Sequence, residues 1–297
     1  MTIPTGEVLV PDVVRELAGD ALVTPVWTNQ LGGLTFRLDP LDEAAPGDSE
    51  PSGRESRGRE SRDRESRGSE PAGRVSDTLR ASTFVKWAPR GERATIEQVE
   101  LTAEAARLRW AASYTPVPHV LEVGADENAE WLVTRAIAAR SAVDPRWLAE
   151  PETAARAIGA GLRALHDALP VQECPWTWGV DDRIAVAEER AAHGYAGSAW
   201  SVENRDRLRD APDHDRLVVC HGDACAPNTL LADDGRWAAH VDLGALGVAD
   251  RWADLAIATY SLGWNYGPGY DHLVYEAYGI DEDADRVAYY RLLWDLG

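Results

Sequence analysis

Two short motifs in the last third of the chain constrain it more than any other feature. Residues 221–228 place Asp223 five positions before Asn228, and an Asp-x-Gly motif begins at Asp242 after a predicted hairpin. Mg²⁺ prefers oxygen ligands, and phosphoryl transfer needs a carboxylate that orients the attacking hydroxyl. The pattern therefore predicts a phosphoryl-transfer site, with Asp223 catalytic and Asn228 and Asp242 as magnesium ligands. The alternative is a chance match, because either motif alone is common in turns.

Lys86 is the only lysine among the 30 Lys and Arg residues of the chain. A lysine kept where arginine is otherwise used favours a compact ammonium group over a planar guanidinium. Kinases need such a group on a strand, where it contacts the α and β phosphates and pairs with a helix glutamate. Lys86 lies in the strand-like run 82–87, which fits this role, and a single accidental lysine is the alternative.

Composition excludes several classes of protein. The formal net charge is −20, which argues against a nucleic-acid partner and is compatible with a cationic small molecule. The chain has no apolar run near 18 residues and no secretory signal, so we expect a cytoplasmic protein without a membrane span. Its three cysteines form no Cys-x-x-Cys pattern, which indicates neither a disulfide framework nor a zinc site. Cys225 is expected to be a packed residue rather than a nucleophile.

A low-complexity segment interrupts the first half of the chain. Residues 40–80 contain a five-residue Arg-Glu-Ser repeat of nearly balanced charge, with Pro, Gly and Ser around it and no aromatic residue. Such a segment buries too little apolar area to offset its ordering entropy, so we expect a disordered insertion. It separates the strand-like runs 34–38 and 83–87, which we expect to pair as an extended hairpin.

The remaining hydrophobic patterns predict an α+β fold of two lobes. Residues 1–135 are expected to form a small N-terminal lobe with an antiparallel sheet, and residues 136–297 a mostly helical C-terminal lobe. The expected strands are 21–28, 34–38, 83–87, 120–123, 131–134, 217–220, 229–231 and 237–241, and the expected helices are 95–112, 154–169, 181–192, 202–209, 249–262, 269–278 and 283–296.

The motifs resemble those of the aminoglycoside phosphotransferases, antibiotic-resistance kinases with a protein-kinase-like fold, and especially their 3' and 3'' branches. The resemblance covers most of the chain except residues 40–80. It rests on residues 104–110, 116–118, 131–134, 174–175, 217–228, 241–244, 246–251 and 289–293. It implies that the chain uses ATP or GTP with Mg²⁺ to phosphorylate a hydroxyl of a cationic small-molecule antibiotic.

The resemblance also implies a role for individual residues. The helix partner of Lys86 would be Glu104, and the adenine would bind backbone groups near Thr134 and Ala136. Asp254 would brace the loop that carries the catalytic residue. These assignments complete a nucleotide site formed by Lys86, Glu104, Thr134, Ala136, Asp223, Asn228 and Asp242.

The acceptor side follows less directly from the sequence. Asp295, Glu203 and the terminal carboxylate are candidates to bind ammonium groups, although Glu203 also fits a solvated helix face. Three positions depart from the family pattern: Ala245 replaces the usual arginine, and Trp264 with Asn265 replaces an acidic pair. Two alternatives therefore stay open, a kinase of another small hydroxylated molecule and a nucleotide-binding relative without transfer activity.

Overall fold

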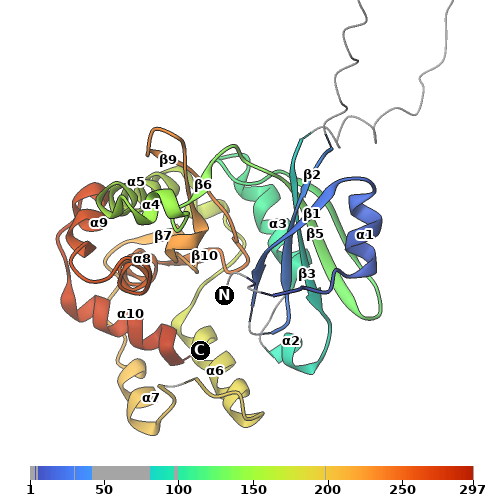
Figure 1. Ribbon diagram of the computed structural model, residues 1–297. Helices are drawn as coiled ribbons and strands as arrows, with labels where there is room; N and C mark the ends of the chain where they lie inside the picture. The colour runs from blue at the N-terminus through green and yellow to red at the C-terminus, as the bar shows by residue number, and fades with distance from the viewer. Residues whose placement is uncertain are drawn as a thin grey trace, which may run out of the picture.

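The computed structural model describes residues 4, 6–29, 31–41, 81–96, 100–197 and 199–296. Most of the predicted insertion, residues 42–80, lies outside the described residues, and so does Gly297 with its terminal carboxylate. Figure 1 shows a sheet lobe and a larger helical lobe side by side, as predicted. The proposed lobe boundary after residue 135 falls where β5 ends and stays a prediction.

The N-terminal lobe is a five-stranded antiparallel sheet with the order β1-β2-β3-β5-β4. Its β2 and β3 are neighbours, with Leu38 paired to Thr83, which confirms the expected hairpin across the insertion. The strands are β1 (Leu22–Thr28), β2 (Leu34–Asp39), β3 (Thr83–Pro89), β4 (Val120–Ala125) and β5 (Ala129–Arg135).

Alternation along β3 gives the sheet two different faces. Val85 points into a small core under helix α1 (Asp12–Ala18), which the sequence did not predict. Lys86 pairs with Leu132 of β5 and lies on the opposite face, toward helix α3 (Leu101–Ala111). The single helix expected over 95–112 is wrong: α2 (Glu92–Ile96) ends before residues 97–99, and Glu100 is extended at the start of α3.

The C-terminal lobe is built mainly from helices. These are α4 (Pro145–Leu148), α5 (Pro151–Ala168), α6 (Val180–Ala192), α7 (Val202–Arg209), α8 (Trp252–Asn265), α9 (Asp271–Tyr278) and α10 (Ala284–Leu296), with short strands β6 (Arg140–Ser141), β7 (Leu217–Cys220), β8 (Thr229–Leu231), β9 (Trp237–His240) and β10 (Gly247–Asp250). The helix expected from residue 249 starts later, because residues 247–250 pair with β7 instead. Among the described residues, no helix is both long and apolar enough to cross a bilayer.

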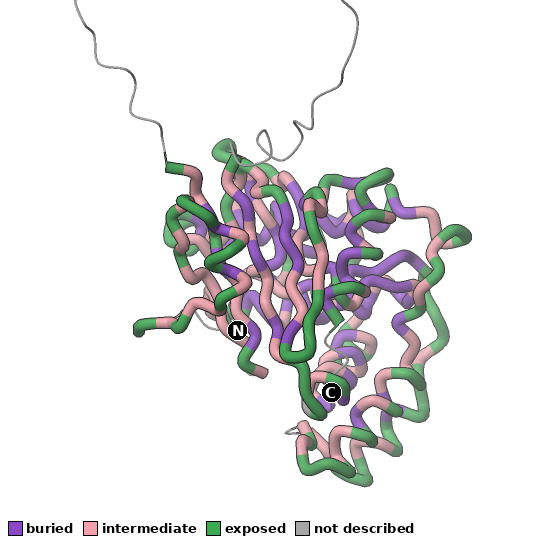
Figure 2. Tube along the Cα trace, turned by 90° about the vertical axis from the view of Figure 1, so that its right-hand side faces the viewer, coloured by how far each residue is buried: buried purple, intermediate pink, exposed green. Residues whose placement is uncertain are grey.

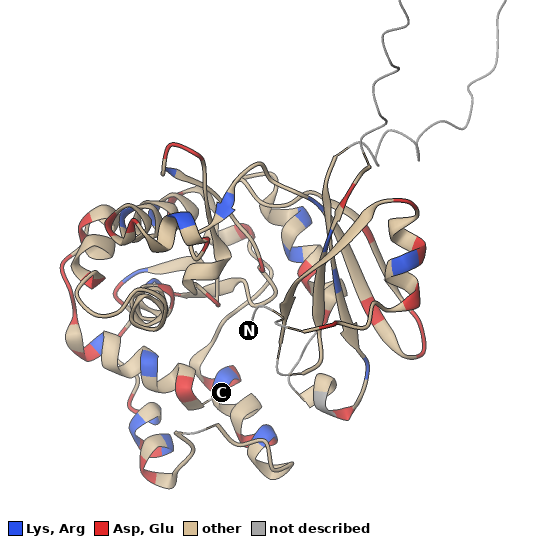
Figure 3. Ribbon diagram, viewed as in Figure 1, with Lys and Arg blue, Asp and Glu red and all other residues tan. Residues whose placement is uncertain are grey.

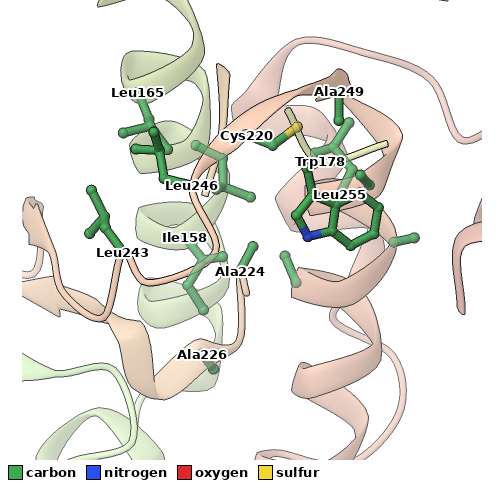
Figure 4. Packing of buried hydrophobic residues seen from close by; sticks show 14 of the residues in the cluster. Ile158, Leu165, Trp178, Cys220, Ala224, Ala226, Leu243, Leu246, Ala249 and Leu255 are labelled. Atoms are coloured by element: carbon green, nitrogen blue, oxygen red, sulfur yellow. The ribbon is translucent and has the colours of Figure 1, made fainter. Parts of the chain in front are cut away.

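The large core lies directly beneath the two motif loops. Helix α5 is buried along one face, with Ile158 and Leu165 fully enclosed. Figure 4 shows these side chains beside Leu243 and Ala226, which belong to the two motif loops. Figure 2 shows buried residues running through the middle of both lobes, with exposed residues at the edges. The apolar core therefore fixes the backbone from which the polar motif side chains project.

Candidate active site

Lys86 connects the two lobes at the centre of the site. Its Nζ lies 2.7 Å from Glu104 Oε1 on α3 and 2.7 Å from Asp242 Oδ1, which is 156 residues away in sequence. Glu104 is only 4% exposed. The structure thus brings together three of the predicted residues in one ion-paired group.

The charges in this group stabilise one another. Burial alone would lower the pKa of Lys86, but the carboxylates of Asp242 and Glu104 outweigh it and raise that pKa. Burial alone would raise the pKa of Asp242, yet the Lys86 ammonium lowers it below its ordinary value. Burial raises the pKa of Glu104 in spite of the same ammonium. The Lys86–Asp242 pair is therefore charged in the folded protein.

The loop of residues 221–228, here called the catalytic loop, follows β7 and is held by helix α8. Asp254 accepts hydrogen bonds from the backbone N–H groups of His221, at 2.6 Å, and Gly222, at 3.0 Å. His166 Nε2 lies 2.9 Å from the same carboxylate, and its Nδ1 lies 2.9 Å from the Tyr278 hydroxyl. His166 is thus a packed residue of α5. Asp254 is fully buried, so these contacts satisfy a carboxylate that water does not reach.

One group of possible metal ligands has a structural explanation. Atoms of His166, Cys220 and Asp254 lie within 4.8 Å of one another. The Cys220 thiol donates to the Asp250 carbonyl at 3.3 Å, and the other two side chains bond each other and the catalytic loop. The possible ligand atoms of all three side chains therefore already have hydrogen-bond partners within the protein.

The side chain of Asp223 points into the space between the lobes. Its Oδ1 is buried and has no hydrogen-bond partner among the described residues. Burial raises the pKa of this carboxyl. Asn228 Nδ2 donates to the Asp223 carbonyl at 2.9 Å, which fixes the amide and leaves its oxygen as the free acceptor. Burial and the nearby Asp223 carboxylate raise the pKa of the Cys225 thiol, which is unsuited to act as a thiolate nucleophile.

The loop that begins at Asp242, here called the metal loop, touches the catalytic loop closely. Asp242 has a φ of 64° and is the only non-glycine residue with positive φ in the part of the chain that the structure describes. Strain of this kind is often stored at functional sites. Gly222 has a φ of 82°, and a Cβ there would lie 2.1 Å from the Ala245 carbonyl oxygen. Glycine is therefore required where the two loops meet.

A cavity of about 690 Å³ opens between the lobes beside these residues. Lys86, Glu104, Asp223 and Asp242 all contribute to its lining. The β1–β2 turn covers one side, where Asn29 Oδ1 accepts hydrogen bonds from the N–H groups of Leu31 and Gly33. Space, charge and an unpaired carboxylate oxygen thus coincide at one place, which is typical of an active site.

Sequence reasoning missed Arg107 in this cavity. Its Nε donates to the Leu246 carbonyl at 3.0 Å, and its guanidinium lies 5.3 Å from the Trp176 ring. Helix α3 therefore holds both the start of the metal loop, through Glu104 and Lys86, and its end, through Arg107. The sequence spacing could have identified Arg107, because it follows Glu104 by about one helical turn and both side chains therefore lie on the same face of α3.

The predicted adenine contacts lie apart from this cavity. Thr134 is paired with Phe84 of β3, and both side chains lie on the cleft face of the sheet, the face that carries Lys86. Thr134 is 9% exposed. The Ala136 N–H already donates to the Ser82 carbonyl at 2.9 Å. Ala136 borders a second cavity of about 450 Å³, which Ser82 and Arg37 also line.

The predicted acceptor residues lie near the end of the chain. The Asp295 carboxylate on α10 accepts from the Tyr260 hydroxyl at 3.2 Å. Glu203 is exposed at the start of α7, and α7 packs against α10. Neither residue lines the cavity at Lys86.

A two-lobed α+β fold with this Lys–Glu–Asp group and two adjoining motif loops defines a protein-kinase-like phosphotransferase. Comparison with known proteins gives the same class, because a family model described as a phosphotransferase enzyme family matches residues 72–290. The aminoglycoside 3'-phosphotransferase of Streptomyces fradiae is 38% identical over 230 residues, which cover 71% of this chain and 84% of the relative.

Solved structures agree with this assignment. An aminoglycoside 3'-phosphotransferase of type VIII superposes with a TM-score of 0.69 at 27% identity, covering 96% of this chain and 97% of that one. Aminoglycoside phosphotransferase APH(3'')-Id of Streptomyces rimosus, in complex with ADP and streptomycin, gives a TM-score of 0.58 at 25% identity over 72% and 90% of the two chains. The chain therefore belongs to the aminoglycoside phosphotransferase family, which confirms the resemblance and the predicted fold class.

Proposed function

We propose that this protein transfers the γ-phosphate of ATP, or of GTP, to a hydroxyl of an aminoglycoside antibiotic and thereby confers resistance. The observation that carries the proposal is the unpaired, buried Oδ1 of Asp223 beside the Lys86–Asp242 ion pair. A carboxylate oxygen without a partner is costly to bury, and a donor hydroxyl from a substrate would satisfy it.

The chain's own residues account for the transfer step. The acceptor hydroxyl donates to Asp223, its oxygen bonds to the γ-phosphorus, and the bond to the nucleoside diphosphate breaks as the proton passes to the Asp223 carboxylate. Lys86 contacts the α and β phosphates while Glu104 holds its ammonium in place. The base would pack against Phe84 and Thr134 on the cleft face of the sheet. Ala136 contributes its N–H only if that group gives up the hydrogen bond to Ser82.

The residues present fit a bound Mg²⁺. Asn228 Oδ1 and the Asp242 carboxylate would hold the ion, because both are hard oxygen ligands on loops that touch each other. The ion would neutralise charge on the transferred phosphate. The hydrogen bond from Asn228 Nδ2 to the Asp223 carbonyl orients the amide oxygen away from the backbone, as a ligand requires.

Ala245 motivates the alternative of an inactive nucleotide-binding relative. The intact group of Lys86, Glu104 and Asp242 counts against this alternative. A kinase of another small hydroxylated molecule would use the same nucleotide site. Figure 3 shows acidic residues spread along the elements of both lobes, among arginines, and the formal net charge is −20. This charge and the carboxylates of Asp295 and Glu203 favour a cationic acceptor over a neutral one.

Mass spectrometry of an aminoglycoside panel incubated with the protein and Mg-ATP tests the proposal. We expect a gain of one phosphate on at least one acceptor. The Asp223→Asn variant should lose roughly 10²-fold or more in turnover while nucleotide binding stays near normal. The matched control is Asp234→Asn, an exposed change that should leave turnover unchanged. No gain of phosphate on any aminoglycoside of the panel would refute the aminoglycoside assignment, and an Asp223→Asn variant above a tenth of wild-type turnover would refute the role of Asp223.

A further inference from the structure

Arg107 belongs to α3 of the N-terminal lobe, but its side chain contacts two segments of the C-terminal lobe. Its Nε donates to the Leu246 carbonyl at 3.0 Å, and its guanidinium carbon lies 5.3 Å from the centroid of the Trp176 ring. The two segments also pair with each other, because the Val248 N–H donates to the Trp176 carbonyl at 2.8 Å and the Trp178 N–H donates to the Val248 carbonyl at 3.0 Å. Arg107 therefore binds a junction that the C-terminal lobe forms by itself.

The first turns of α3 are attached to the sheet instead. Figure 1 shows α3 between the sheet and the C-terminal lobe. The Leu101 N–H donates to Glu130 Oε2 of β5 at 3.0 Å, and Glu104 Oε1 accepts from Lys86 Nζ of β3 at 2.7 Å. Arg107 follows Glu104 by three residues, which is about 4.5 Å along the helix axis. One helix thus sets how far the Lys86–Glu104 pair lies from the end of the metal loop.

The backbone of the metal loop needs support at both ends. Asp242 has a φ of 64°, and a residue with a side chain stays in this conformation only where its surroundings hold it there. At the start of the loop, the Val241 N–H donates to the Asn228 carbonyl at 3.0 Å. At its end, Leu246 is fully buried and Arg107 donates to its carbonyl. Loss of that donor would leave a buried carbonyl unsatisfied and favour a different path of the loop.

We propose that Arg107 is a positioning residue that fixes the metal loop and thereby sets the affinity of the protein for Mg²⁺. The inference rests on the proposed function, in which Asp242 and Asn228 hold the ion. Arg107 acts through the backbone: its hydrogen bond holds Leu246, four residues after Asp242, so that the Asp242 carboxylate stays directed at Lys86. Groups that hold a metal ligand in place typically change metal affinity by about 10- to 100-fold.

Three substitutions separate the hydrogen bond of Arg107 from its charge. In Arg107→Gln the amide nitrogen takes the position of Nε, so the donor to Leu246 is kept and the charge is lost. In Arg107→Lys the charge is kept, but a methylene group replaces Nε. In Arg107→Met a methyl group takes that position, and both are lost. Positioning predicts tighter metal binding in the Gln variant than in the Lys and Met variants. A direct contact of the charge with phosphates in the cavity that Arg107 lines predicts that Lys binds best.

Binding of Mn²⁺ in the presence of saturating ADP tests this order without turnover. Mn²⁺ takes the same oxygen ligands as Mg²⁺, and electron paramagnetic resonance measures its free concentration. The Asp242→Asn variant gives the amount of ion held by ADP alone. We expect Arg107→Met to weaken Mn²⁺ binding by roughly 10- to 100-fold and Arg107→Gln by less than about threefold. The matched control is Arg109→Met, at an exposed arginine of the same helix, which should bind Mn²⁺ like the wild type.

Kinetics give a second readout that a general loss of stability would not produce. Excess Mg²⁺ should restore the kcat of Arg107→Met, because the substitution changes the affinity for the ion and not the reacting groups. A kcat that stays low at saturating Mg²⁺ overturns the proposal. The Trp110 ring lies 5.8 Å from the Trp176 ring, so α3 keeps a contact with the C-terminal lobe when Arg107 is replaced.

The remaining outcomes separate this inference from the proposed function. Wild-type Mn²⁺ binding in Arg107→Met overturns the role of Arg107, and so does tighter binding in Arg107→Lys than in Arg107→Gln. The comparison of Lys with Gln decides the question if the Met variant does not fold. If aminoglycosides are phosphorylated and Arg107→Met binds Mn²⁺ normally, only the role of Arg107 fails. If no aminoglycoside is phosphorylated, the proposed function fails, and the order of Mn²⁺ affinities still decides the role of Arg107.

Discussion

The single lysine of the chain occupies the position where a compact cation is needed. Lys86 Nζ makes contacts of equal length to Glu104 and Asp242, so one nitrogen bridges two elements that belong to different lobes. A guanidinium carries the same charge, but it is longer and its donors form a planar fork. Charge alone therefore does not explain why this position differs from the arginines elsewhere.

We predict that Lys86→Arg lowers kcat/KM by roughly 10²-fold or more, because the guanidinium cannot occupy the ammonium position between two carboxylates and the phosphates. Arg90→Lys is the control, since Arg90 forms a half-exposed pair with Glu130 and its exchange should have little effect. Kinetics with Mg-ATP check both variants. Wild-type rate and nucleotide affinity in Lys86→Arg would contradict the interpretation of the sole lysine.

Alanine substitutions at two glycines should change stability in opposite directions, because one glycine has a strained backbone and the other lies in a helix. Gly222→Ala should destabilise the protein by at least about 2 kcal/mol, because a φ of 82° disfavours a side chain and its Cβ would meet the Ala245 carbonyl. In contrast, Gly263 lies in α8 with nothing within 4 Å of an added Cβ, so Gly263→Ala should stabilise the protein by about 0.5–1 kcal/mol. Denaturant unfolding measures both changes. Equal stabilities for the two variants would contradict the close contact of the loops.

At the scale of elements, helix α8 is the support of the catalytic loop. The buried Asp254 near its first turn binds the loop backbone and His166 of α5, and Ser261 two turns later binds the Ala226 N–H. One helix thus fixes both ends of the loop. Because these hydrogen bonds are buried, their loss is not compensated by water.

Asp254→Asn should therefore cost about 3–5 kcal/mol of unfolding free energy, since an amide replaces one acceptor oxygen with donors that face other donors. Asp271→Asn, at a carboxylate that is 39% exposed in its pair with Arg291, should cost less than about 1 kcal/mol. Urea unfolding of both variants provides the comparison. A loss below about 1 kcal/mol in Asp254→Asn would show that α8 does not anchor the loop through this carboxylate.

At the scale of the whole molecule, the long insertion connects two strands that already lie side by side. Leu38 in β2 pairs with Thr83 in β3, so the ends of the insertion are held one ladder spacing apart, about 5 Å. A short linker can span that distance. The Arg-Glu-Ser repeat also has no apolar face that could contribute to either core.

Replacing residues 45–75 with a short Gly-Ser linker should consequently leave the fold and the kinetics with Mg-ATP intact. We expect a change in Tm of less than about 5 °C, since a shorter loop loses slightly less entropy on closure. Thermal unfolding followed by circular dichroism measures the change. A larger drop in Tm would show that the segment packs against the folded lobes.

Local patterns in the sequence predicted the two-lobed α+β fold and four residues of the nucleotide site, Lys86, Asp223, Asn228 and Asp242. Helical periodicity predicted α5, α6 and α7 closely, and alternation predicted the strands of the N-terminal sheet. Lys86 and Asp242 were identified from residue type and order, whereas Glu104 was identified only from the family resemblance. The roles assigned to them, and to Asp223 and Asn228, stay predictions that the kinetic experiments address.

Only the tertiary structure decided which distant groups meet. Residues 247–250 had helical neighbours in sequence, yet they form β10 because β7 offers a strand partner. The contact of Arg107 with Leu246 spans 139 residues. Periodicity specifies the face that a segment buries, whereas hydrogen-bond partners and exposed surface are set by elements brought together from far along the chain.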